Sequence, residues 1–321
     1  MPAAPALRWG LTLPFPGVTL AECEPLVRQA EAAGYDDLWS GDTTGPDGFT
    51  PLALAAAWTD RPRLGTGIVS AFTRTPVVLA QHAAALADAS GGRFVLGVGA
   101  SSNVIVERWN EIPFERPLSK IRETVAALRP ILAGDRGPGG FKLEQPPAAP
   151  VPIYIAALRQ KMLELGGEIA DGVFVNFLPL SGAESVCNTI TAASNGSDRG
   201  GEVDVVCRFF CIPGSIEDGI ALARFMFAAY GTVPVYAEFF RSLGWAEQLD
   251  PMVDAWRSGD RKRALELAPD ELIKEIFIFG SPKEQHARLA RYADAGITTF
   301  VLTPIAAPEQ LPKLIDALAH R

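Results

Sequence analysis

The chain has 321 residues, of which 48% are hydrophobic and 21% are charged, and its net charge is −8. A chain of this length forms one large domain or two ordinary ones, and α/β barrels often reach about 250 residues as one domain. An acidic chain without long runs of one charge lacks the basic footprint that nucleic acids or anionic membranes require. No apolar run reaches the ~20 residues that span a bilayer, so we expect a soluble protein.

The cysteines and the first residues bear on redox state and location. Residues 1–7 show no basic region followed by an apolar stretch, so we expect no secretion signal and a cytoplasmic protein. The cysteines lack the paired spacing of a zinc site, and we expect them in the core rather than in a redox or metal role. They are Cys23, Cys187, Cys207 and Cys211.

Apolar runs alternate with helical patterns along the whole chain. We expect strands at 8–13, 37–41, from 64, 93–99, 152–157, 172–177, 203–212 and 298–303. Helices are expected at 19–34, 50–58, 76–89, 103–133 with a break near Pro113 and Pro117, 160–170, 182–193, 282–296 and 308–319. Strand and helix units in this number favour a single (β/α)8 TIM barrel over 1–321, because an open sheet rarely holds so many without a second domain.

Two insertions are expected, after the fourth and the seventh strand. Residues 134–150 are rich in Gly and Pro and predict an irregular excursion over one end of the barrel. The segment of about 214–275 predicts helices interrupted at Pro234 and Pro251. Because loops on a rigid barrel usually carry the substrate site, we expect this helical insertion to form part of the substrate pocket.

Glycines are unusually placed on the third and fourth strands. Gly65, Gly67, Gly97 and Gly99 lie inside these strands or at their carboxyl ends. A glycine in a strand marks a bulge or a close approach of the backbone, either to a ligand or to tightly packed neighbours. For any one glycine the two explanations are equally good, and the clustering favours a planar ligand across both strands.

These same stretches carry a resemblance to a known family. Leu64-Gly-Thr-Gly-Ile-Val, Thr73-Arg-Thr-Pro76 and the run from Gly91 to Ser101 resemble the luciferase-like monooxygenase superfamily, and most closely its branch that uses the deazaflavin coenzyme F420. Further agreeing stretches are 115–118, 156–172 and 279–296. The resemblance covers almost the whole chain and implies the barrel fold and a homodimer.

The resemblance also implies where the cofactor binds. A non-proline cis peptide at Gly67-Ile68, followed by Val69, is expected to press a backbone bulge against the central ring of the cofactor. The turn Gly99-Ala100-Ser101 matches the one that contacts the pyrimidine side of the deazaflavin. From the residues alone, an ordinary trans strand and a serine-capped helix start are the simpler alternatives.

A second part of the expected site begins where the fifth strand ends. Ala156, Ala157, Leu158, Arg159 and Gln160 lead into a helix, whose first amides and dipole favour a phosphate. The F420 branch commonly has Gly-Pro at the last two positions. Arg159 and Gln160 in place of Gly-Pro either close the loop against the cofactor or let Arg159 bind the cofactor phosphate with two hydrogen bonds. An exposed arginine without a ligand is the alternative.

Two carboxylates are candidates for proton transfer. Asp42 follows the second strand, where a loop carboxylate can reach a ligand at the barrel mouth, so we also expect it among the cofactor-binding residues. Glu107 lies in the helical segment after the fourth strand, and each carboxylate could equally be a solvated charge. The family usually has a histidine near the first position, where this chain has Thr43. The histidines are expected on helices facing away from the barrel mouth: His82, His286 and His320.

Aromatic residues near the expected mouth could wall an apolar pocket, although residues at helical spacing are more often core. They are Phe72, Trp109, Phe177, Tyr230, Tyr236, Phe239 and Trp245. No metal cluster, nucleophile elbow or phosphate-binding lysine loop is present as a motif.

The leading prediction is an F420-dependent oxidoreductase that transfers a hydride between deazaflavin C5 and a C=C, C=N or C=O group of a small molecule. An FMN-dependent monooxygenase supplied by a partner reductase is the alternative enzyme. The absence of a histidine after Asp42 leaves open a third possibility, a barrel that binds a flavin or deazaflavin without catalysis.

Overall fold

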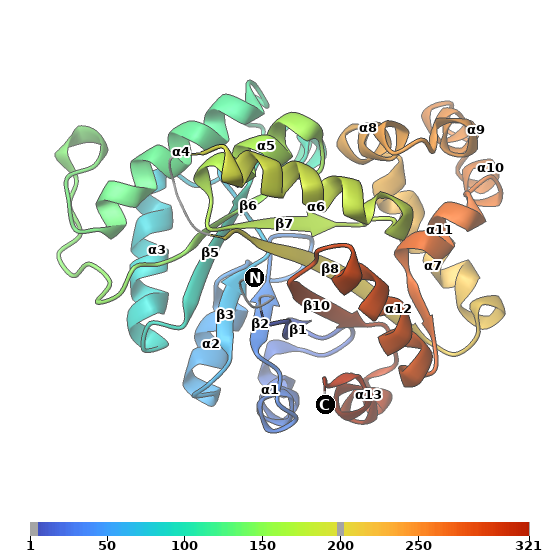
Figure 1. The fold of residues 1–321 in the computed structure, drawn as a ribbon, viewed down its shortest axis with the longest axis horizontal. Helices are drawn as coiled ribbons and strands as arrows, with labels where there is room; N and C mark the ends of the chain where they lie inside the picture. Colours follow the sequence, from blue (N-terminus) through green and yellow to red (C-terminus); the bar gives the residue numbers. More distant parts are fainter. Residues whose placement is uncertain (1–5, 198–201, 321) are drawn as a thin grey trace.

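The computed structural model describes residues 6–197 and 202–320 and shows a closed barrel of eight parallel strands (Figure 1). The last strand pairs with both the first strand and β8, which closes the barrel. This confirms the predicted fold class. The barrel strands are β1 (Arg8–Thr12), β2 (Asp37–Ser40), β3 (Arg63–Thr66) with its continuation β4 (Val69–Ser70), β5 (Phe94–Gly99), β6 (Ile153–Ala156), β7 (Gly172–Asn176), β8 (Asp204–Pro213) and β10 (Thr299–Pro304).

Helices follow the strands and surround the barrel (Figure 1). Most begin where the sequence predicts: the capping box of Ser281 and Glu284 is formed, and Thr75 caps the helix that begins at Pro76. They are α1 (Glu24–Ala32), α2 (Thr50–Trp58), α3 (Pro76–Ala89), α4 (Pro117–Leu132), α5 (Gln160–Ile169), α6 (Leu180–Asn195), α12 (Pro282–Asp294) and α13 (Leu311–Leu318), with short 3-10 turns at Leu20–Glu22, Pro138–Gly140 and Pro308–Gln310.

Both insertions are present. After β5 the chain forms a single π-helical turn, η2 (Val104–Trp109), and the excursion that follows α4 reaches outward at the left of Figure 1. After β8 come α7 (Ile216–Gly231), α8 (Pro234–Ser242), α9 (Ala246–Arg257), α10 (Arg261–Glu266) and α11 (Asp270–Ile276). The insertion ends in β9 (Ile278–Gly280), a short strand that the sequence did not predict and that pairs with the end of β8.

The predicted break at Pro251 is wrong, because this proline lies inside α9. The helices of the insertion end instead near Gly244 and Gly259, whose φ angles are 90° and 91°. Only glycine adopts this left-handed conformation without strain, so these two residues, rather than the proline, separate the helices.

The cysteines are buried, as expected, and burial raises the pKa of the Cys187 thiol to about 12. His82 in α3 stacks on Phe49, at 4.4 Å between ring centroids. His286 in α12 and His320 both stack on Trp9. The placement of His320 on a helix is wrong, because α13 ends at Leu318.

No single helix among the described residues has the length and hydropathy to cross a bilayer. Helices α7 and α8 would reach that length together, but they are bent by 104°.

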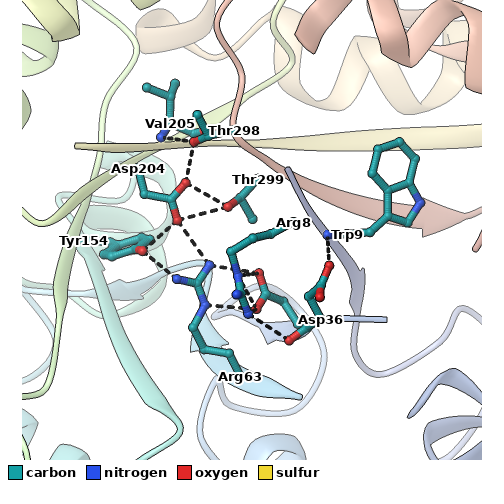
Figure 2. Close-up of polar contacts among 10 residues, drawn as sticks. Arg8, Trp9, Asp36, Arg63, Tyr154, Asp204, Val205, Thr298 and Thr299 are labelled. Carbon is teal, nitrogen blue, oxygen red and sulfur yellow. Dashed lines mark hydrogen bonds and ion pairs between the residues drawn. The ribbon is translucent and has the colours of Figure 1, made fainter. Parts of the chain in front are cut away.

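Polar side chains fill the amino-terminal end of the barrel, which we name the barrel floor (Figure 2). Arg63 donates to both carboxylate oxygens of Asp37 at 2.9 Å and to Asp204 at 3.1 Å. The first residues of five strands meet here, together with Tyr154 of β6: Arg8, Asp37, Arg63, Asp204 and Thr299. Above the floor, an apolar layer fills the middle of the barrel: Trp39, Val95, Tyr154, Phe174, Val206 and Val301.

The charges of the floor compensate one another. Burial opposes ionisation of Asp204, but Arg63 and hydrogen bonds from Thr298, Tyr154 and Thr299 outweigh it and lower the pKa of this carboxyl group. Asp204 therefore contributes stability above the pKa of an unfolded aspartate, about 3.9, and this contribution is lost as the pH falls through the lowered pKa of the folded state. The floor thus fills this end of the barrel with paired polar side chains.

Replacing Arg63 with Met removes the cation that Asp37 and Asp204 share. Because Asp204 then lies in the floor without a cation, we expect the free energy of unfolding at pH 7 to fall by about 3–5 kcal/mol. The loss should shrink toward pH 4, because uncompensated burial raises the pKa of Asp204 in the variant and protonation removes the penalty. Urea denaturation at the two pH values measures both effects.

Glu266→Gln is the control, since it breaks the exposed pair of Glu266 with Arg263 and should change little at either pH. An Arg63→Met variant no less stable than this control would contradict the role given to the floor.

Candidate active site

The third strand is broken by a bulge at the carboxyl end of the barrel. Gly65 pairs with Val95, and Val69 pairs with Val98. Three residues of the broken strand, 66–68, therefore lie opposite only two of β5, and the extra residue forms the bulge. The peptide bond Gly67–Ile68 within it is cis, as predicted.

Side-chain and backbone bonds hold the bulge in place. The Oγ1 atom of Thr66 donates to the carbonyl of Gly97 at 2.8 Å and accepts from its amide at 2.7 Å, which replaces the missing ladder bonds. On the other side, Gly67 donates to the carbonyl of Ser40 at 2.6 Å, and Ile68 accepts from the amide of Asp42 at 2.9 Å. The bulge is thus tied to both neighbouring strands.

The strand glycines make room for protein atoms. A Cβ atom at Gly97 would lie 1.9 Å from the carbonyl oxygen of Thr66, and one at Gly65 would lie 2.3 Å from the Trp39 ring. A Cβ at Gly67 would meet the Phe174 ring at 2.6 Å, and one at Gly99 would meet Ile68 at 2.7 Å. Tight packing around the bulge therefore accounts for each of the four positions, and contact with a planar ligand remains a prediction.

The carboxyl end of the barrel is open, in contrast to the floor. Gly67 and Ile68 are partly exposed, whereas Leu64 to Thr66 before them and Val69 and Ser70 after them are buried. Partly exposed residues also occupy the ends of the next strands: Ala100, Ser101, Ala156, Asn176 and Arg208. The bulge and these partly exposed strand ends make up the carboxyl end of the barrel, which we name the mouth.

Two residues at the mouth other than glycine adopt a left-handed backbone conformation. The φ angle is 63° at Ser101, after β5, and 53° at Phe177, after β7. Such left-handed residues other than glycine are uncommon and cluster at ligand and active sites. Ser102 accepts from the amide of Ile105 at 3.3 Å, so the serine cap predicted for this turn forms at the second serine.

The predicted phosphate position lies at the start of α5. Arg159 is the N-cap residue and is exposed, and no side chain caps this helix end. Its first amides and the helix dipole can therefore receive an anion. The neighbouring Ala157 and Leu158 are buried and half-buried, and Gln160 bonds to Glu164.

The two predicted proton-transfer residues have different surroundings. Asp42 forms a bidentate pair with Arg74, and its carboxylate also accepts from the amides of Gly48 and Ser70 at 3.0 and 3.3 Å. It thereby ties its own loop to the strand beyond the bulge. Glu107 is exposed on η2.

A cavity of about 540 Å³ opens beside the bulge. Residues 12–19 after β1 and 41–46 after β2, without Asp42, form most of its wall. Arg208 of β8 is the only charged residue among those lining it. Gly41 joins the cavity to the bulge, because a Cβ atom there would lie 2.8 Å from the carbonyl oxygen of Gly67.

Sequence reasoning missed Arg208 and the threonines of the cavity as site residues. The signal was present, because Arg208 interrupts an otherwise apolar strand, and a charged residue inside a barrel strand needs a partner or a ligand. No residue of the insertion lines this cavity among the described residues. The expected pocket role of the insertion therefore stays a prediction.

The predicted aromatic wall is divided. Phe177, Tyr230 and Tyr236 form one cluster, with ring centroids 4.5–5.7 Å apart. Phe72 packs against Phe114 in a tilted arrangement, with ring centroids 5.0 Å apart, and Trp109 is exposed. Phe177 and Phe239 are both buried, so they belong to the core rather than to a pocket wall. Trp245 is half-buried at the start of α9.

A family model described as luciferase-like monooxygenase matches residues 9–299. A Mycobacterium tuberculosis protein, provisionally named a coenzyme F420-dependent oxidoreductase, is 29% identical over 309 residues, which cover 87% of this chain and 89% of that protein. The 5,10-methylenetetrahydromethanopterin reductase of Methanolobus tindarius is 29% identical over 293 residues, covering 85% and 86%. The solved structure of coenzyme F420-dependent tetrahydromethanopterin reductase from Methanopyrus kandleri has a TM-score of 0.79, with 23% identity and 98% of both chains covered.

Barrel enzymes carry their active sites at the carboxyl ends of the strands, which is where the bulge and the cavity of this barrel lie. The chain belongs to the luciferase-like monooxygenase family, and it is an oxidoreductase.

Replacing Gly97 with Ala should displace the bulge, because the new methyl group and the carbonyl of Thr66 cannot both occupy their positions. We expect a loss of about 1–3 kcal/mol in the free energy of unfolding, measured by urea denaturation. Gly196→Ala is the matched control, since Gly196 is exposed, has a φ of −84° and has, among the residues that the structure describes, no atom closer than 3.5 Å to an added Cβ. Equal stability of the two variants would contradict the close contact inferred between the Thr66 carbonyl and Gly97.

Proposed function

We propose that the protein is a coenzyme F420-dependent oxidoreductase acting on a small organic substrate. The observation that carries this proposal is the partly exposed bulge at Gly67–Ile68, held against a wall of small residues at the mouth. A backbone ridge of this kind can support one face of a planar tricyclic ring. The F420-dependent relatives support the choice of cofactor.

The residues at the mouth fit such a cofactor. The ring would lie against Ile68, with its pyrimidine edge at Ala100 and Ser101, which are partly exposed where the strand ends. Ala156, on the neighbouring strand β6, adds only a methyl group beside Gly99. When bound, the deazaflavin supplies the hydride donor or acceptor at C5, and the protein supplies position, exclusion of water and a proton carrier.

The phosphate of the cofactor would be held at the start of α5. Arg159 offers a guanidinium beside uncapped amides, and both attract an anion.

Titration of the protein with F420 and with FMN tests the choice of cofactor. We expect F420 to bind more tightly, and Arg159→Gln to weaken F420 binding about 10-fold, because a charge-assisted hydrogen bond contributes roughly 1.5–3 kcal/mol. Arg136→Gln is the control, since Arg136 is an exposed arginine outside the mouth. Tighter binding of FMN would support the monooxygenase alternative instead.

Asp42 is the better placed of the two proton carriers. Its two neighbours in the chain, Gly41 and Thr43, line the cavity, although Asp42 itself does not, whereas Glu107 is exposed on η2 and has no neighbour in the chain that lines the cavity. As a carboxylate, Asp42 accepts a proton when the substrate is oxidised and returns it in the reverse direction. The pair with Arg74 fixes where this carboxylate points.

We expect Asp42→Asn to lower kcat by about 10²–10⁴, the usual contribution of a positioned acid or base, with little change in the affinity for F420. Glu107→Gln should keep kcat within a factor of about 3. Steady-state and binding measurements on both variants check this. Loss of activity in Glu107→Gln alone would reverse the assignment, and the absence of turnover of any electron-poor substrate would support the non-catalytic barrel.

The assembly of the protein as a homodimer remains a prediction.

A further inference from the structure

Arg208 differs from the other arginines of the barrel interior. In the floor, Arg8 and Arg63 pair with Asp37, and near the mouth Arg74 pairs with Asp42 (Figure 2 shows the floor). Within the part of the chain that the structure describes, Arg208 forms no ion pair, and its Nη1 and Nη2 atoms have no hydrogen-bond partner. The side chain is nevertheless half-buried, in the wall of the cavity.

Neutral groups fix the orientation of this guanidinium. Its Nε atom donates to the amide oxygen of Asn176 at 3.2 Å, and Asn176 donates to the hydroxyl of Tyr236 at 3.0 Å. The guanidinium also lies over the Phe210 ring, 4.9 Å from its centroid. Burial raises the pKa of Tyr236 to about 12, so the phenol stays neutral and does not cancel the charge of Arg208. Tyr236 belongs to α8, which links the insertion to the mouth.

A held guanidinium with its terminal nitrogens free is a bidentate receptor for a carboxylate. The rest of the cavity provides hydroxyl groups from Thr12, Thr43 and Thr44 and an apolar surface from Pro14, Pro16 and Val18, which are partly exposed. Its volume of about 540 Å³ suits a small molecule. A ligand held there would lie next to the bulge, because Gly41 borders both.

We propose that Arg208 binds the carboxylate of the substrate, so that the enzyme acts on small organic acids with an apolar body. Asn176 and Tyr236 are positioning residues that hold the guanidinium. This inference rests on the proposed function for the identity of the reaction, but the carboxylate site can be tested without it.

The test compares benzoate with benzamide, a neutral molecule of similar shape, by calorimetric titration of the protein with and without F420. We expect wild type to bind benzoate more tightly than benzamide, and Arg208→Gln to lose roughly 10- to 100-fold in benzoate affinity with benzamide unchanged. Arg208→Lys should keep part of the preference, because lysine retains the positive charge but lacks the two terminal nitrogens that bind a carboxylate in a bidentate way. Tyr236→Phe should reduce the preference by a smaller factor, and Arg136→Gln should leave it unchanged.

The outcomes distinguish a substrate carboxylate from an anionic group of the cofactor as the partner of Arg208. A wild-type protein without preference for benzoate, or a preference that survives Arg208→Gln, would overturn the proposal. Loss of F420 affinity in Arg208→Gln with benzoate binding intact would assign the guanidinium to the cofactor, and this would also overturn it. If wild type binds no F420 but prefers benzoate through Arg208, the carboxylate site stands and the proposed redox function fails.

Discussion

The contact between Thr66 and Gly97 is the constraint on which the mouth of this barrel depends. The carbonyl of Thr66 occupies the space that a side chain at Gly97 would need, and the Thr66 hydroxyl restores the two hydrogen bonds that the broken strand lacks. An extra residue can therefore enter the strand without opening the barrel. The bulge projects Ile68 into the mouth, and Gly41 and Gly99 leave room for it on both sides.

The two ends of the barrel are chemically opposite. At the floor, arginines and aspartates neutralise one another, and an apolar layer seals the interior above them. At the mouth, the last residues of β5 and β6 are small: Gly99 and Ala156. Arg208 and Asn176 lie on β8 and β7. A self-compensated floor stabilises the fold, whereas the uncompensated charge at the mouth is available to a ligand.

The barrel, both insertions and the cis bond at Gly67–Ile68 could be predicted, because strand and helix periods are local and the bulge lies in a recognisable motif. Three features could not. Pro251 fits within α9 because its helix is set by the glycines at its ends. The strand Ile278–Gly280 is formed only by pairing with the distant end of β8. The pairing of Asp42 with Arg74 depends on a contact between segments far apart in sequence, which no local pattern encodes. Arg208, by contrast, is marked by its charge inside a strand, although the pattern does not show that its terminal nitrogens are free.

A crystal structure of the protein with F420 tests the account most directly, because the bulge is assigned as the support of a planar ring. The account predicts density for the tricycle against the backbone of Gly67 and Ile68, with its pyrimidine edge at Ala100 and Ser101 and its phosphate at the start of α5. Density for the ring elsewhere on the barrel, with Ile68 still exposed to solvent, would contradict it.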